Sequence, residues 1–387
     1  MRSYPALHER VDCDVLIVGA GITGALIADT LSTAGMRVCV IDKREAGWGS
    51  TAASTALLQY EIDVELQDLA ELFGIKDAVL AYRACEQAVL RIGALVRGLR
   101  GVDFRRMRSL YFASRRSHEQ QLRREGALRR AHGFDVRTLE AGAVRAQHGI
   151  DAPVALLTQV AAEVDPYQLA HALLARVRRR GGMIHARTEL VEFVPQRGSV
   201  RVRTADDIAI HCQHLIFAAG YESERHLEQR VASNRSSYAF VSEPLQGGIG
   251  SLRNTLIWES ARPYLYLRST RDGRAIVGGL DDAIDIAIKR NARVPGKTAM
   301  LINRIGALLP HLQTRPAFAW AGTFAETADG LPFFGPHPQH GSRVHFAMAY
   351  GGNGITYSAI GAQILLASLQ GKTHPCADLF SFRRLTR

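Results

Sequence analysis

Residues 14–24 read Asp14-Val15-Leu16-Ile17-Val18-Gly19-Ala20-Gly21-Ile22-Thr23-Gly24, and this stretch decides the fold. Residues 14–18 form a short apolar run rich in β-branched side chains, which predicts a strand buried on both faces, as in a parallel sheet. Three glycines follow with the spacing Gly-x-Gly-x-x-Gly, and a helical pattern then continues to about Gly35. A second strand is predicted over 37–41. The stretch therefore predicts the first strand–helix–strand unit of a parallel α/β sheet.

The three glycines each have a physical role in binding a dinucleotide. Gly19 permits the tight turn, Gly21 lets the backbone approach a pyrophosphate, and Gly24 allows the helix to pack closely on the strand. The helix start offers free N–H groups and a partial positive charge to phosphates. Asp42 ends the second strand, where a carboxylate can accept hydrogen bonds from ribose hydroxyls. We therefore predict a dinucleotide site, although this motif alone does not separate FAD from NAD.

The chain of 387 residues is long enough for two domains, and its formal charge is +11 from 48 basic and 37 acidic residues. Much of the basic excess lies between Arg91 and Arg145. Such a segment can mark nucleic acid, an anionic membrane surface or an acidic substrate. No aromatic residues interleave with it as in a base-stacking surface, so we interpret it as a solvated helix face and expect no nucleic-acid partner.

The five cysteines are far apart and form no CxxC pair, so the sequence predicts neither a metal site nor a disulfide framework. This scattered set is typical of a reducing cytoplasm. The longest uncharged stretch, Val344 to Gly371, is long enough to cross a membrane, but glycines interrupt it. We predict a buried strand, a glycine turn and a buried helix there.

The loop after Asp42 resembles the segment that wraps the flavin diphosphate and ring in the superfamily of D-amino acid oxidase, glycine oxidase and sarcosine oxidase. Three further segments match that family in order. They are Val164-Asp165-Pro166 with the helix that follows, His214-Leu215-Ile216-Phe217-Ala218-Ala219-Gly220, and Asp329-Gly330-Leu331-Pro332-Phe333-Phe334-Gly335-Pro336 with the glycine turn and helix after it. The similarity covers most of the chain and implies a FAD-dependent oxidoreductase.

This resemblance implies an α/β fold with a Rossmann-like FAD-binding domain built from the discontinuous pieces 1–80, 150–225 and 330–387. The remainder, 81–149 and 226–329, is expected to form a substrate domain whose mixed sheet lies over the flavin. Strands are predicted there at Ser109–Ala113, Tyr238–Ser242, Tyr264–Arg268 and Ala275–Gly279. The residues expected to contact FAD are Gly19, Gly21, Ile22, Thr23, Gly24, Asp42, Lys43, Gly49, Ser50, Thr51, Ala53, Ser54, Ala218, Ala219, Gly220, Gly330, Leu331, Gly351, Gly352, Asn353, Gly354, Ile355 and Thr356.

Two local patterns bear on the chemistry of the flavin. Backbone amides at the helix start near Gly354 can stabilise negative charge that develops near N1 of a reduced flavin. Some relatives bind FAD covalently through Cys or His. Here the loop has Thr51 and Ala52 and no His, and the stretch Trp320–Leu331 has no Cys. We therefore expect noncovalent FAD.

The substrate-binding pattern of the family is incomplete in this chain. Glycine oxidase-like enzymes carry an Arg shortly before Asp-Gly-Leu-Pro, and the matching stretch 320–327 has none. We expect Arg268, or failing that Arg262, to hold an anionic group of the substrate, with Tyr266 on the same strand face. In the alternative interpretation Arg268 pairs with Glu259 or Asp272 as a structural group.

Tyr60 and Glu61 follow the loop expected near the flavin ring. One interpretation places them at the border of the substrate cavity, where Glu61 can bind a substrate ammonium. The other places them at a solvated helix terminus.

Three functions follow from these observations. The leading hypothesis is oxidation of the C–N bond of a small amine or amino acid by hydride transfer to flavin N5, after which the imine hydrolyses in water. The second is oxidation of the C–OH bond of a 2-hydroxy acid or polyol, which requires a base such as His near N5. The third is a binding or RNA-modification module that uses FAD indirectly, suggested by the Arg-rich segment. The sequence leaves open the exact substrate and the electron acceptor.

Overall fold

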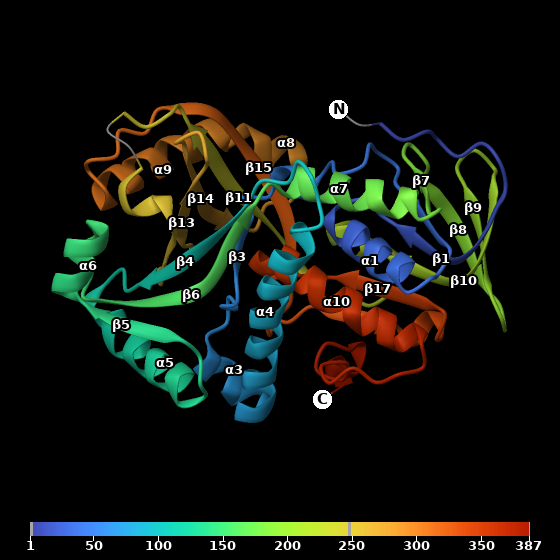
Figure 1. The fold of residues 1–387 in the computed structure, drawn as a ribbon, viewed down its shortest axis with the longest axis horizontal. Coiled ribbons are helices and arrows are strands. Elements are labelled where there is room, and N and C mark those ends of the chain that lie inside the picture. The colour runs from blue at the N-terminus through green and yellow to red at the C-terminus, as the bar shows by residue number, and fades with distance from the viewer. Residues whose placement is uncertain (1–2, 247–248, 387) are drawn as a thin grey trace.

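The first sheet carries the N-terminal motif and is mainly parallel. The computed structural model describes residues 3–246 and 249–386, and Figure 1 shows their arrangement. In this sheet the strand order is β16-β17-β10-β1-β2-β7, and β8 and β9 extend it beside β10. The strands are β1 (Val11–Val18), β2 (Val38–Ile41), β7 (Met183–His185), β8 (Leu190–Pro195), β9 (Val200–Thr204), β10 (Ala209–Phe217), β16 (Phe333–Pro336) and β17 (Val344–Met348). The chain neighbours β1 and β2 are parallel, as the N-terminal stretch predicts.

Strand order in this sheet brings distant motifs together. β10 lies between β1 and β17 and is parallel to both. The carboxyl ends of parallel strands meet at one edge of a sheet, so the turns after all three strands lie side by side. The N-terminal glycine motif, the turn 218–220 and the glycine turn 349–354 are thereby assembled from three separate parts of the chain.

Helices cover this sheet and share one apolar core with it. That core contains buried side chains of α1 (Ile22–Thr33), α4 (Ile75–Val96), α7 (Pro166–Arg179) and α10 (Gly354–Leu369). α7 begins at the Asp-Pro pair because Asp165 accepts a hydrogen bond from the Gln168 backbone N–H and Pro166 occupies the first turn. The uncharged stretch 344–371 forms β17, a short turn and the buried helix α10, as predicted. In the described part of the chain no helix has both the length and the apolar character that a membrane span needs.

The second sheet has nine strands and is mixed. Its order is β15-β11-β14-β13-β12-β4-β6-β3, with β5 beside β6. β12 and β4 are parallel, whereas the other pairs are antiparallel. The strands are β3 (Leu57–Gln59), β4 (Phe104–Phe112), β5 (Val136–Glu140), β6 (Val154–Val164), β11 (Ser233–Ser242), β12 (Thr255–Glu259), β13 (Leu265–Ser269), β14 (Ala275–Asp282) and β15 (Pro316–Glu326). The four strands predicted for a mixed sheet correspond to β4, β11, β13 and β14.

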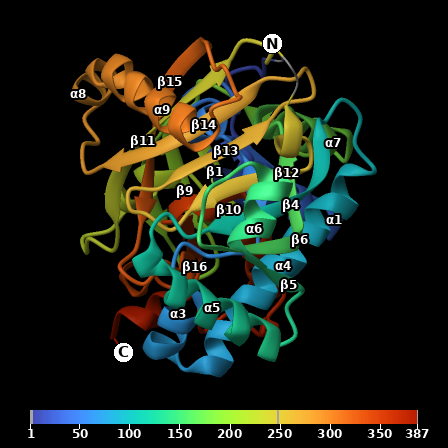
Figure 2. The same cartoon turned by 90° about the vertical axis from the view of Figure 1, so that its left-hand side faces the viewer.

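One face of this sheet packs on helix α9 (Val294–Leu308), which Figure 2 shows alongside β14. The other face is turned toward the first sheet. The remaining helices are α2 (Ser50–Ala53), α3 (Leu66–Phe73), α5 (Glu119–Ala131), α6 (Ala141–His148) and α8 (Ala287–Ala292), and the short 3₁₀ turns are η1 (Arg116–His118), η2 (Gly220–His226), η3 (Gly250–Arg253), η4 (Pro338–His340), η5 (Gly351–Asn353) and η6 (Phe382–Thr386).

The two sheets do not follow the predicted division of the chain at two strands. β3 and β6 fall within the pieces 1–80 and 150–225 that were expected in the FAD-binding domain, yet both belong to the second sheet. β6 pairs with β4 over most of its length and also with β3 and β5. The partner of a strand depends on contacts between distant segments, which local hydrophobic patterns do not encode.

Candidate active site

A cavity lies where the two sheets face each other. Its lining comes from the N-terminal motif, the loop 48–57, the strand ends near 188–190 and 218–225, the glycine turn 349–355, and the second sheet. Two hydrogen bonds join the loop to strand β15 across this space. Trp320 Nε1 donates to the Ala53 carbonyl at 2.8 Å, and Ser50 Oγ donates to the Thr323 carbonyl at 2.9 Å. The cavity walls are therefore tied together by the same loop that the sequence placed near a flavin.

The glycines of the N-terminal motif hold backbone segments in contact. A Cβ on Gly24 would lie 1.8 Å from the Gly19 carbonyl oxygen. Gly19 has φ +116°, and a Cβ there would lie 2.4 Å from the Ala218 carbonyl oxygen. The first contact fits the helix–strand packing predicted for Gly24, and the second closes the turn against strand β10.

The first turn of α1 lies against the loop. Thr51 Oγ1 accepts a hydrogen bond from the Ile22 backbone N–H at 2.9 Å. The same oxygen would be 2.9 Å from a Cβ on Gly21. Gly21, Ile22 and Thr51 all line the cavity. This narrow space beside a helix N-terminus, open only because Gly21 lacks a side chain, fits a pyrophosphate.

Asp42 is fixed by backbone groups at the end of β2. Its Oδ2 accepts from the Ala20 N–H and its Oδ1 from the Arg44 N–H, each at 2.8 Å. Burial raises the pKa of this carboxyl, although the two backbone hydrogen bonds favour its ionised form. Each carboxylate oxygen keeps a further lone pair, so Asp42 can also accept from a ribose hydroxyl.

Basic side chains surround this end of the cavity and share one carboxylate. Arg44 Nη2 lies 2.8 Å from Glu222 Oε1, and Lys43 pairs with the other oxygen of the same residue. Burial acts to raise the pKa of Glu222, but the hydrogen bond from Lys43 and the neighbouring cations outweigh it and lower the pKa. Lys43, Arg44 and Arg225 line the cavity here, which suits the phosphates and ribose of an adenosine diphosphate.

The start of α10 forms a second helix N-terminus at the cavity. Asn353 Nδ2 donates to the Glu61 carbonyl at 2.5 Å, and the Gly352 N–H donates to Asp63 Oδ2 at 2.8 Å. A Cβ on Gly352 would also lie 2.8 Å from that carboxylate oxygen. The turn is therefore held against residues 61–63, with the positive end of the helix toward the cavity.

Most residues predicted to contact FAD line this cavity, and five do not. Gly24, Gly49, Gly330, Leu331 and Thr356 lie outside the lining. Gly24 packs the helix, and Gly330 adopts φ +73°, where a Cβ would meet the Val64 side chain at 2.5 Å. Leu331 and Thr356 are buried. Gly24, Gly330, Leu331 and Thr356 therefore support the backbone around the cavity without lining it. The remaining eighteen, together with both helix N-termini, form a site that fits a noncovalently bound FAD.

The end of the cavity under the second sheet is lined by Tyr264, Tyr266, Asp281, Ser237 and Trp258. The Tyr264 and Tyr266 ring centroids are 5.7 Å apart, and Ser237 Oγ lies 3.3 Å from the Tyr266 hydroxyl. Burial, with the Asp281 carboxylate nearby, raises the pKa of Tyr266 to about 12. Burial and Asp63 raise the pKa of Tyr264 well above its usual value. Both phenols are neutral at physiological pH and can donate hydrogen bonds.

Of the five residues predicted to bind or orient the substrate, only Tyr266 lines the cavity. Arg268 is buried beyond it, where Nε donates to the Thr55 carbonyl and Nη1 to the Ser269 carbonyl. Its charged partner is Glu163 at 3.7 Å, not the Glu259 or Asp272 that the alternative interpretation named. Strand alternation correctly placed Arg268 on the same face of β13 as Tyr266. The cavity ends near Tyr266, however, and the Arg268 side chain lies beyond that end.

Arg262, Tyr60 and Glu61 also lie outside the lining. Arg262 Nη2 donates to the Asp63 carbonyl at 2.6 Å, and its guanidinium sits 4.7 Å from the Tyr264 ring centroid. Tyr60 and Glu61 are fully buried rather than at a solvated terminus, and Glu61 Oε1 accepts from Thr158 at 2.9 Å and lies 3.9 Å from Arg129. Glu61 lies in the irregular segment after β3, and its side chain points into the interior toward Thr158 and Arg129.

Two acidic residues of the lining were missed. Asp63 follows the predicted pair 60–61 by two positions, but it lies in the irregular segment after β3, so alternation from the inward-facing Glu61 gave no signal for it. Asp281 follows the predicted strand Ala275–Gly279, and regular alternation would have turned it away from the cavity. Among the described residues, no cysteine or histidine lines the cavity, and no group of three or more His, Cys, Asp or Glu side chains is arranged to hold a metal.

The chain is similar to known flavoproteins over most of its length. The sequence profile of the family described as FAD dependent oxidoreductase matches residues 14–368. Glycine oxidase of Bacillus licheniformis is 24% identical over 92% of this chain and 93% of its own. The structure of glycine oxidase from Geobacillus kaustophilus superposes with TM-score 0.81 at 19% identity, covering 96% of this chain and 98% of that one. L-α-glycerophosphate oxidase from Mycoplasma pneumoniae with FAD bound gives TM-score 0.77 at 18% identity, covering 94% and 97%.

Proposed function

This chain belongs to the family of FAD dependent oxidoreductases, and from that premise we propose that it oxidises the C–N bond of a small amine or amino acid, with noncovalent FAD as oxidant. The observation that carries the proposal is the composition of the cavity. One continuous lining joins the dinucleotide motif and the start of α10 to a chamber walled by Tyr264, Tyr266 and Asp281. When bound, FAD supplies a hydride acceptor at N5.

The side chains of the chamber are suited to orientation rather than to proton abstraction from carbon. Tyr264 and Tyr266 present neutral hydroxyls and flat apolar rings, which fix a small substrate against the flavin side of the cavity. The N-terminus of α10 lines the cavity, and its positive end would stabilise negative charge on a reduced flavin bound there. In the overall reaction the substrate loses a C–H bond as hydride, and its nitrogen lone pair forms the C=N bond that water then hydrolyses.

Oxidation of a C–OH bond is less well supported by this site. That reaction needs a base to remove the hydroxyl proton, and the sequence hypothesis assigned the role to a histidine. None of the histidines in the described part of the chain lines the cavity, so a carboxylate of the lining such as Asp281 would have to serve as that base. Amine oxidation has no such requirement once the amine is neutral.

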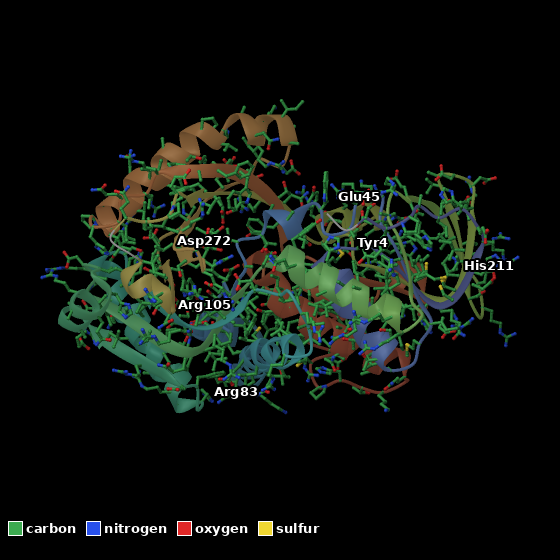
Figure 3. All side chains as sticks on the ribbon, turned by 45° about the horizontal axis from the view of Figure 1, so that its top comes forward. Tyr4, Glu45, Arg83, Arg105, His211 and Asp272 are labelled. Atoms are coloured by element: carbon green, nitrogen blue, oxygen red, sulfur yellow. The ribbon has the colours of Figure 1, made fainter. Side chains whose placement is uncertain are left out.

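An RNA-directed role is also less well supported, because four of the fourteen arginines of the basic segment pair with carboxylates within the protein. Arg123 pairs with Glu119 and Glu140, Arg145 pairs with Asp151, and Arg129 is fully buried beside Glu125. Arg105, labelled in Figure 3, pairs with Glu163 at 2.6 Å. Each pair removes positive charge from the surface that would contact phosphates.

The test is anaerobic bleaching of the flavin in the FAD-loaded protein. Panels of amines, amino acids, 2-hydroxy acids and RNA are added separately, and the flavin absorbance is followed. We expect bleaching by an amine or amino acid, with a carbonyl product, and none by hydroxy acids or RNA. Gly21→Val protein purified in parallel reports any contaminating oxidase. Bleaching by hydroxy acids alone would replace the proposal with C–OH oxidation.

A further inference from the structure

We propose that the chamber under the second sheet binds a cationic nitrogen of the substrate, held by the carboxylates of Asp281 and Asp63 beside the rings of Tyr264 and Tyr266. Binding of the cation does not depend on the proposed function, whereas oxidation of the bound amine rests on it. It names the substrate class as an amine that carries a second, positively charged nitrogen, in place of the anionic group that Arg268 or Arg262 was expected to hold.

A β-bulge in β14 aims Asp281 into the cavity. Ala275 and Val277 face the apolar core under α9, and Gly278 lies on the opposite face, against the Tyr266 ring. Continued alternation would turn residue 280 toward the cavity and residue 281 into the core. The structure shows the reverse, because Leu280 is buried in the core and Asp281 lines the cavity.

The register of the sheet shows where the alternation changes. Tyr238 pairs with Gly279, whereas Ser236 pairs with Asp282, so β14 contains one extra residue over this interval. Leu280 adopts φ +56°, a conformation that a leucine rarely takes. Bulges and strained residues of this kind cluster next to functional sites, where they redirect a side chain. Here the strain has one visible consequence, which is to place a carboxylate in the chamber.

The two carboxylates of the chamber have no cationic partner of their own. Asp281 Oδ1 is buried and has no hydrogen-bond partner among the described residues. Within that part of the chain, neither Asp281 nor Asp63 has a Lys, Arg or His nitrogen within 4.0 Å. Asp63 accepts from the Gly352 N–H and lies 3.5 Å from the Tyr264 hydroxyl. Both residues are half-buried, and a partly desolvated carboxylate without a cationic partner is stabilised when a cation binds beside it.

Electrostatics in the chamber favour a cation. The Arg262 guanidinium acts electrostatically on these groups, but it donates to the backbone carbonyl of Asp63 rather than to its carboxylate. Burial is the main cause that raises the pKa of Asp281, to about 6, and Asp63 and Glu326 act in the same direction against Arg262 and the Ser237 hydroxyl. Two carboxylates and two aromatic faces form the usual surroundings of an alkylammonium group.

The protonation state of the bound nitrogen shows whether it is also the nitrogen that is oxidised. An ammonium between two carboxylates keeps its proton, because the pair stabilises its charged form. Loss of hydride from carbon requires a neutral amine whose lone pair forms the new C=N bond. A single nitrogen does not meet both conditions at once, so the nitrogen held by Asp281 and Asp63 is not the one oxidised. A diamine, or a longer amine with a terminal ammonium, satisfies both.

The binding test uses three probes of one length that differ in charge. Butylammonium, 1-butanol and butanoate are titrated anaerobically into the FAD-loaded protein, and dissociation constants are taken from the flavin difference spectrum and from calorimetry. We expect butylammonium to bind tightest. Equal or weaker binding of butylammonium relative to 1-butanol overturns the cation site, and preferential binding of butanoate points back to an arginine. This ranking needs no variant.

Asp281→Asn then assigns the preference to a residue. It should weaken butylammonium binding roughly 10- to 100-fold, as expected for loss of a charged hydrogen bond, and leave 1-butanol unchanged. Asp285→Asn removes an exposed carboxylate just beyond the same strand and should leave the ranking as in the wild type. If Asp281→Asn does not hold flavin, Asp63→Asn serves in its place. An unaltered preference in both chamber variants overturns the assignment.

Flavin reduction separates this inference from the proposed function. α,ω-Diamines of increasing length should reduce the flavin at least 10-fold more efficiently than butylamine at equal concentration, since only they fill both positions. Butylammonium binding without reduction by any amine would leave the cation site standing and defeat C–N oxidation. Equal reduction by butylamine and every diamine would defeat the requirement for a second nitrogen.

Discussion

At the scale of single residues, the candidate cofactor site depends on glycines, whose lack of a side chain leaves room for other groups. Gly21 lines the cavity beside Thr51, and Gly24 touches the Gly19 carbonyl, so side chains are excluded at both positions for different reasons. At Gly21 we expect a ligand to use the space, whereas at Gly24 the Gly19 backbone already fills it. The two positions should therefore respond differently to substitution.

Gly21→Val should abolish FAD binding while the protein stays folded. A branched side chain would fill the space beside the α1 N-terminus where we expect the pyrophosphate. The measurement is titration of apoprotein with FAD, with circular dichroism to check the fold. Gly142→Ala is the control, because a Cβ there meets nothing within 4 Å. FAD affinity equal to that of the wild type would refute the nucleotide assignment of this motif.

Asp42→Ala should weaken FAD binding by roughly 1–3 kcal/mol, through loss of charge-assisted hydrogen bonds. It should also lower the free energy of unfolding of the apoprotein, since the Ala20 and Arg44 N–H groups lose their acceptor. Calorimetric titration and urea denaturation measure the two effects separately. A loss of stability with unchanged FAD affinity would give Asp42 a purely structural role.

Asp281→Asn should stabilise the apoprotein more strongly as pH rises. Burial, with Asp63 and Glu326 near, raises the pKa of the folded carboxyl to about 6 from 3.8, against the opposing effects of Ser237 and Arg262. The stability that the protonated Asp281 carboxyl contributes is therefore present below its pKa in the unfolded chain. It is lost as pH rises through its pKa in the folded protein. The variant lacks this loss, so its advantage in urea denaturation should grow by roughly 1–2 kcal/mol between about pH 5 and about pH 8. A difference independent of pH would show that the carboxylate is already compensated.

At the scale of elements, the bulged end of β14 shapes the chamber. Gly279 has φ +133°, and a Cβ there would lie 2.0 Å from the Tyr264 carbonyl oxygen. β14 thus approaches the chain just before β13, at Tyr264, where β14 also turns Asp281 toward the cavity. The geometry of one strand pair controls two side chains of the proposed substrate site.

Gly279→Ala should destabilise the protein by roughly 1–3 kcal/mol, because the new methyl group forces the strands apart in a conformation alanine avoids. It should also weaken butylammonium binding by moving Tyr264 and Asp281. The matched control is Gly296→Ala in α9, where a Cβ meets nothing within 4 Å and the change should be stabilising by roughly 0.5–1 kcal/mol. Thermal denaturation compares the two. Equal stability of both variants would mean that the bulge tolerates a side chain.

At the scale of the whole molecule, FAD is expected to contact pieces from both ends of the chain and from the middle. The cavity lining draws residues from the segments 19–23, 42–57, 218–225 and 349–355, together with strands of the second sheet. A ligand that bridges so many segments binds the folded state and not the unfolded chain. Its occupancy should therefore stabilise the whole fold rather than one loop.

Saturating FAD should raise the melting temperature cooperatively, with a gain in unfolding free energy of about 2.7 kcal/mol at a hundredfold excess over Kd. Denaturation by acid or heat should then release all the flavin, since no cysteine or histidine among the described residues lines the cavity. The readouts are differential scanning calorimetry and the absorbance of the supernatant after precipitation. Yellow colour retained by the denatured protein would contradict noncovalent binding.

The sequence by itself determined the family, and it predicted eighteen of the residues that line the cavity where we expect the cofactor. The glycine motif, the loop 49–54 and the segments at 218–220 and 351–355 are local patterns, because a backbone that must approach a dinucleotide constrains residue types position by position. Those constraints remain readable without knowing the fold around them. The mixed second sheet was likewise indicated by its strand patterns, although not the membership of β3 and β6.

Only the tertiary structure decided which side chains face the substrate. Arg268 was predicted from strand alternation and a family pattern, yet it lies past the cavity, bound to backbone carbonyls beside Glu163. Asp281 was missed because one extra residue in β14 reverses the alternation, and that bulge is visible only when β11 lies beside it. Local sequence predicts which side chains of a strand share a face. Contacts between segments distant in sequence decide where a cavity ends and where a bulge shifts the register.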